Sequence, residues 1–214
     1  MSNATKRLTF FLLVVLSFGC SSVYYKFWET FGQEKRDLLR SNVEAAQDEQ
    51  ENLEEEFKDT ISRIRSEYKF DAGNLEETYD ELSEDLEDAE SRATALSDRI
   101  DRVEDIAGDL FAEWRQEISE LSNPKFKRDS KRKLQSTQKK FTSMLKAMRQ
   151  VENNIEPILR KFRDQVIYLK HNLNAAALGA FKTEFAAIEG DIEKLLRDIS
   201  ASTSQASAFI DQLE

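Results

Sequence analysis

The feature that most constrains this chain is the spacing of its apolar residues, which recur in steps of three and four. This spacing places them on one face of an α-helix and is typical of coiled coils and helical bundles. Four such series follow one another, at residues 39–64, 68–114, 134–173 and 178–213. Only six glycines and two prolines interrupt the 214 residues, which excludes the loop-rich β folds.

Three short segments separate the four series. Asp71–Asn74 contains turn-forming residues, Ser122–Pro124 contains a helix-breaking proline, and His171–Asn174 contains asparagines that can cap a helix. The apolar register also slips by one residue between the first two series. Residues 34–121 therefore form either a helical hairpin or one continuous helix with a register skip.

The third series has the widest apolar face, because Met144, Val151 and Ile158 form a second line beside the first. A wide face favours a bundle over a two-stranded coiled coil. Pro157 lies inside this series and is expected to kink the helix or loosen its turn. We predict an all-α fold, an elongated antiparallel bundle of four long helices with coiled-coil-like heptads, each roughly 60–70 Å long. Such a thin bundle could also form a homo-oligomer.

The N-terminus has the pattern of a secretory signal. Lys6 and Arg7 precede the apolar run Leu8–Phe18, which is too short for a membrane-spanning helix of about 20 residues. A basic start, a short apolar run and then small residues predict that residues 1–19 are a signal peptide.

The end of this signal resembles the lipobox of bacterial lipoproteins. Cys20 is the single cysteine and stands where the apolar run ends, so we expect it to carry the lipid. Ser17 and Phe18 depart from the usual pattern, which leaves open whether the site is processed. Ser21 stands where bacterial lipoproteins retained in the inner membrane carry aspartate. These features predict a periplasmic protein anchored to the outer membrane of a Gram-negative bacterium.

Charge is divided unevenly along the mature chain. After a lipid-anchored segment at 20–33, we expect an acidic hairpin at 34–121 and a second hairpin at 122–214 packed on the first. Residues 23–121 contain 12 basic and 30 acidic residues, whereas residues 122–170 contain 14 basic and 4 acidic ones. The net charge of −10 thus conceals one basic helix.

The basic helix has two interpretations. The favoured one is internal pairing, in which six basic residues lie opposite acidic residues between Asp98 and Glu117: Lys131, Arg132, Lys139, Lys140, Lys146 and Arg149. The alternative is contact with an anionic membrane surface. The candidate residues for that contact are Lys125, Lys127, Arg128, Lys131, Arg132 and Lys133, with Phe126 among them.

No motif indicates catalysis, a cofactor or a metal site. The chain lacks a phosphate-binding loop, a dinucleotide fingerprint and a zinc-protease motif, and it has one histidine, His171. The acidic stretch at 49–90 is best explained as a solvated surface. The acidic first half argues against binding of nucleic acid. We therefore predict that the protein is not an enzyme and has no catalytic, cofactor or metal-binding residues.

Two segments carry a family resemblance. They run from Ala89 to Trp114 and from Phe162 to Ala175, the second containing Phe162-Arg163-Asp164-Gln165-Val166-Ile167-Tyr168-Leu169. Both resemble an uncharacterised family of proteobacterial envelope proteins known only as a domain of unknown function. The resemblance implies a mostly helical lipoprotein or secreted protein and supplies no functional residues. We expect a lipid-anchored scaffold with an envelope protein as partner, or alternatively a module that binds an anionic lipid or membrane surface through a basic turn at residues 125–133.

Overall fold

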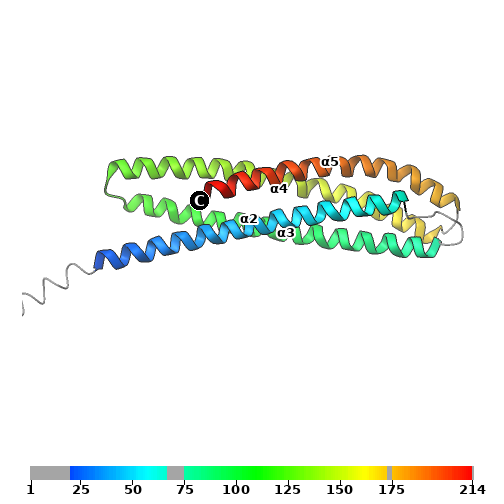
Figure 1. Ribbon diagram of the computed structural model, residues 1–214, viewed down its shortest axis with the longest axis horizontal. Helices are drawn as coiled ribbons and strands as arrows, with labels where there is room; N and C mark the ends of the chain where they lie inside the picture. The colour runs from blue at the N-terminus through cyan, green and yellow to red at the C-terminus, as the bar shows by residue number, and fades with distance from the viewer. Residues whose placement is uncertain (1–19, 67–74, 173–174, 214) are drawn as a thin grey trace, which may run out of the picture.

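The computed structural model describes residues 20–66, 75–172 and 175–213. They form four long helices: α2 (Cys20–Ser66), α3 (Leu75–Glu120), α4 (Pro124–His171) and α5 (Ala175–Leu213). Successive helices run in opposite directions and each packs against two neighbours, so α2 closes the bundle against α5 (Figure 1). The predicted all-α antiparallel bundle is confirmed.

The core follows the heptad series closely. Most of the apolar residues at these positions are almost fully buried on all four helices, as Leu53, Leu96, Met148 and Ile199 illustrate. Three polar residues on the same spacing, Gln50, Thr60 and Ser202, are buried too, whereas Gln138 and Glu152 are half-buried. The second line on α4, Met144, Val151 and Ile158, is also buried, which confirms the wide face.

Residues 34–121 contain two helices rather than one. α2 ends at Ser66 and α3 begins at Leu75, and the two helices pack side by side. The Arg63 guanidinium of α2 forms an ion pair with the Asp85 carboxylate of α3, which could not meet on one straight helix. The expected turn at Asp71–Asn74 lies outside the described residues.

The connection between α3 and α4 is set by its cap. The Asn123 side chain accepts hydrogen bonds from the backbone N–H groups of Lys125 and Phe126, at 2.9 and 3.4 Å. Pro124 occupies the first helical position, where a missing N–H costs nothing. The helix therefore begins at once, and the expected stop at Ser122–Pro124 is confirmed.

Pro157 does not interrupt α4, which runs from Pro124 to His171. The proline is exposed, so the backbone carbonyl of Asn153 that loses its helical partner lies on the hydrated side of the helix. The Asn153 side chain also donates to the Arg149 carbonyl at 2.7 Å. α4 is thus continuous through this turn, and the expected kink stays a prediction.

The rod has two distinct ends. The start of α2 and the α3–α4 connection lie at one end. The end of α2, the start of α3, the end of α4 and the start of α5 lie at the other (Figure 1). Across the described ranges, no helix combines the length and the apolar character needed to cross a bilayer.

Candidate functional site

The candidate site lies at the end of the rod where α2 begins. Cys20 is the first residue of α2, and the α3–α4 connection ends the bundle on the same side (Figure 1). The cysteine side chain and residues 1–19 lie outside the described residues, so lipidation and the signal peptide stay predictions. What the structure supplies is the position of the basic residues relative to the start of α2.

Six basic residues form what we call the basic tip: Lys125, Lys127, Arg128, Lys131, Arg132 and Lys133. They occupy the first three turns of α4 rather than a loop, because Asn123 and Pro124 start the helix immediately. Five of the six side chains are exposed, and Lys127 is half-buried. A helix holds these charges at fixed positions on a rigid surface.

This placement is electrostatically unfavourable for the isolated protein. The N-terminus of a helix carries a partial positive charge, and acidic side chains there are stabilising whereas basic ones are not. The first turn of α4 contains no acidic residue. Within the described residues, the only ion pair of the basic tip joins Arg132 to Asp129. The tip therefore presents concentrated positive charge that the protein itself leaves largely uncompensated.

Two members of this region have additional roles. Lys127 Nζ donates to the backbone carbonyl of Ser119 at 3.0 Å, so it satisfies a carbonyl at the end of α3 and is partly structural. Phe126, between Lys125 and Lys127, is 58% exposed. An exposed aromatic ring among basic side chains is typical of surfaces that contact lipid headgroups.

A cluster behind the tip joins three helices. Trp114 Nε1 donates to Ser130 Oγ of α4 at 2.9 Å. From α2, the Arg36 guanidinium lies 5.3 Å from the centre of the Trp114 ring, and Lys35 Nζ lies 2.9 Å from Glu113 Oε2. The heptad pattern places Trp114 in the core. It does not predict that the side chain is only half-buried and contacts Arg36 of α2 and Ser130 of α4. This cluster fixes the basic tip relative to α2.

Within this cluster, the folded protein disfavours the ionised form of the Glu117 carboxyl group. Burial raises the pKa of Glu117 above its usual value, and the neighbouring Glu113 carboxylate raises it further, against the opposing effect of Arg36. The folded state thus binds this proton more tightly than the unfolded chain does. The contribution of Glu117 to stability is therefore lost as the pH rises from the pKa of this group in the unfolded chain to its higher pKa in the folded protein.

Glu117→Gln is therefore expected to stabilise the protein at pH 7. The gain should be below about 1 kcal/mol, because the carboxyl is only half-buried, and it should shrink toward pH 4. Urea unfolding of both proteins at the two pH values measures the difference. Glu87→Gln, at an exposed position on α3 with no ion pair among the described residues, is the control and should change little. A larger gain at pH 4 than at pH 7 would contradict the assignment.

Internal pairing of the basic helix holds for Arg149. Its Nη2 lies 2.6 Å from Asp101 Oδ1 and 2.7 Å from Glu104 Oε2, both on α3. Burial lowers the pKa of this guanidinium, but the hydrogen bonds that it donates to Glu104, Glu152 and Asp101 outweigh burial and raise it. Arg149 is thus a firm connection between α3 and α4.

The predicted pairing with acidic residues of α3 was wrong for the other five basic residues of that set. Arg132 pairs within its own helix. Among the described residues no ion pair forms at the other four, which are exposed on α4: Lys131, Lys139, Lys140 and Lys146. Helical periodicity shows that these residues share the polar face, but it does not show that this face points away from α3.

The opposite end of the rod offers no metal site within the described ranges. Asp80, Glu84 and Asp88 are exposed on α3, as expected for a solvated acidic surface. Asp85 is the exception, because it is buried against Arg63. His171, the last residue of α4, is exposed.

Comparison with known proteins identifies a family but no characterised relative. Neither the search of curated proteins nor the search of solved structures finds a match. A family model with the description "Protein of unknown function (DUF2959)" matches residues 24–213, which cover all four helices almost completely. The chain therefore belongs to the DUF2959 family.

Proposed function

We propose that this protein is a non-enzymatic helical rod of the Gram-negative cell envelope. In this proposal a lipid on Cys20 tethers it to the outer membrane, and the basic tip orients it by contacting anionic headgroups. The body of the rod extends into the periplasm as a scaffold for a protein partner. The observation that carries the proposal is the position of the uncompensated basic tip at the same end as the start of α2 (Figure 1).

The geometry supports simultaneous tethering and surface contact. A chain anchored at Cys20, the first residue of α2, would bring the end of the rod where α4 begins close to the bilayer (Figure 1). Each Lys or Arg near an anionic surface contributes about 1 kcal/mol. The acyl chains on Cys20 would fix one point of the rod at the bilayer, and a basic surface nearby would make a second, electrostatic contribution that sets its orientation. The basic tip can supply that contribution.

The shape supports a scaffold or spacer role. α4 contains 48 residues, which correspond to about 70 Å of helix. The cluster around Trp114 joins the basic tip to α2 and α3, so an orientation set at the membrane would be transmitted along the rod. A partner would then be held at a defined distance from the bilayer.

Charge reversal at the basic tip tests the surface contact. We expect Lys125→Glu, Lys131→Glu and Lys133→Glu together to weaken binding to vesicles of phosphatidylglycerol and phosphatidylcholine by at least about tenfold at low salt. Co-sedimentation of the full chain carrying Cys20→Ser measures this without the lipid. All three lysines lack an ion pair among the described residues, so folding should be unaffected.

The matched control is Lys139→Glu, Lys140→Glu and Lys146→Glu. These lysines are exposed on the same helix and have no ion pair within the described ranges, so net charge changes equally. We expect the control to bind vesicles far better than the tip variant. Equal loss in both variants would show that only net charge matters, and unchanged binding of the tip variant would refute the contact.

A further inference from the structure

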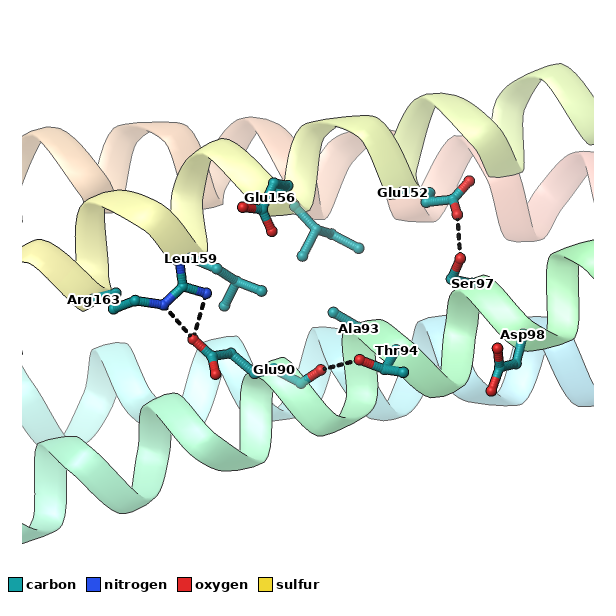
Figure 2. Close-up of a pocket in the computed structure, with 10 residues that line it drawn as sticks. Glu90, Ala93, Thr94, Ser97, Asp98, Glu152, Glu156, Leu159 and Arg163 are labelled. Atoms are coloured by element: carbon teal, nitrogen blue, oxygen red, sulfur yellow. Dashed lines mark hydrogen bonds and ion pairs between the residues drawn. The ribbon is translucent and has the colours of Figure 1, made fainter.

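A groove of about 410 Å³ separates α3 from α4 at a distance from the basic tip. Its floor is apolar and consists of Ala93, Ile155 and Leu159. Figure 2 shows Ala93 and Leu159 directed into the space between the two helices. The volume falls within the range of sites that hold ligand-sized groups, about 300–1,000 Å³.

The groove exists because two heptad positions are filled by unsuitable core residues. Ala93 on α3 and Glu152 on α4 both continue the apolar series of their helices. One side chain is too small to fill the interface and the other is charged. Both residues are only half-buried, whereas Ala89, Leu96 and Met148 in the same series are buried.

Cross-helix bonds hold the groove in shape. Near one end, Arg163 Nη2 lies 2.6 Å from Glu90 Oε1 (Figure 2). Near the other, Ser97 Oγ donates to Glu152 Oε1 at 2.6 Å, and within α4 Arg149 donates to the second oxygen of Glu152 at 3.0 Å. The groove is thus formed before any partner arrives, which reduces the cost of binding.

The walls are negatively charged on both sides. Asp98 of α3 has no ion-pair partner among the described residues, and Glu156 of α4 lies 3.6 Å from Arg160 as its one partner there. α3 as a whole contains 17 acidic and 4 basic residues. An apolar floor between acidic walls is complementary to an apolar side chain flanked by basic ones.

We propose that this groove binds a basic amphipathic helix of a protein partner, with an apolar side chain on Ala93, Ile155 and Leu159. Lysine or arginine side chains one turn to either side pair with Asp98 and Glu156. Helices of this kind place apolar anchors and charges at such spacing. The inference rests on the proposed scaffold function and specifies the surface and the chemistry of its partner.

The test uses a synthetic alanine-based helical peptide with two leucines one turn apart, flanked by arginines. Its comparison peptide has every arginine replaced by glutamate. Fluorescence anisotropy with the full chain is expected to show binding of the arginine peptide and none of the glutamate peptide. Ala93→Phe, which fills the groove, should weaken binding about tenfold or more. Asp98→Asn with Glu156→Gln should weaken it and reduce its salt dependence.

Ala112→Phe is the matched control, because it makes the same change at an exposed site elsewhere on α3. It should leave binding unchanged. Thr94→Phe, at the exposed rim of the groove, repeats the test if Ala93→Phe has a lower melting temperature. Equal binding by Ala93→Phe, Thr94→Phe and wild type would overturn the proposal, as would equal loss in Ala112→Phe. Vesicle binding should be normal in every groove variant, so this inference can fail while the basic tip still binds lipid.

Discussion

Phe141→Ala is expected to lower the free energy of unfolding by about 3–5 kcal/mol. Phe141 is buried where three helices meet, with its ring centre 5.5 Å from that of Phe111 on α3 and 5.7 Å from that of Phe209 on α5. The contact with Phe111 is edge-to-face at 74°, a favoured aromatic arrangement. Removing the ring would leave a cavity and end both aromatic contacts, and urea unfolding would measure the loss.

Phe126→Ala is the matched control on the same helix. Its ring is 58% exposed, so its removal should change stability by no more than about 0.5 kcal/mol. A similar small effect at both positions would mean that the junction of α3, α4 and α5 repacks or is not formed. A large effect at Phe126 would mean that its ring is buried in solution, for example in an oligomer.

The core was predictable because it depends on one repeating quantity, the position of each residue around its own helix. Gln50 and Ser202 show how far this holds, since both are buried although their side chains are polar. Neither side chain has a hydrogen-bond partner for its buried atoms within the part of the chain that the structure describes. Burial of these residues follows from heptad position alone, which overrode their chemistry.

Contacts between helices were less predictable because they depend on the stagger of one helix along another. Arg149 meets Asp101 and Glu104, but Lys139 and Lys140 on the same helix point to solvent. The groove likewise needs Ala93 to lie at the level of Leu159. A period within one helix fixes angles around its axis and not this axial offset.

The basic tip was found from composition, but its electrostatic character came from the structure. The cluster of charge between Lys125 and Lys133 is plain in the sequence. From the sequence alone these residues were expected in a turn. Because Asn123 and Pro124 begin α4 there, the charges add to the positive end of the helix. A feature that opposes local stability without compensation is expected at a functional site.

Cys20→Ser is expected to move the protein from the outer-membrane fraction to the soluble periplasmic fraction almost completely. Each acyl methylene buried in the bilayer contributes about 0.8 kcal/mol to membrane affinity, and Cys20→Ser removes all of these contributions. The basic tip alone would then hold the protein only reversibly and in a salt-dependent way. Cell fractionation followed by immunoblotting measures the shift, and the intact mass of the mature chain shows whether its first residue is a lipid-modified cysteine.

Ser22→Ala is the control for this change, because it alters a neighbouring small polar residue and leaves the thiol in place. It should remain in the membrane fraction and keep the lipid mass. Combining Cys20→Ser with charge reversal at the basic tip should remove the residual, salt-sensitive binding, since the two contributions are independent. An unmodified Cys20 in wild-type protein, or membrane retention of Cys20→Ser at high salt, would contradict lipid tethering. The basic tip would then have to hold the rod at the membrane by itself or bind a different anionic surface.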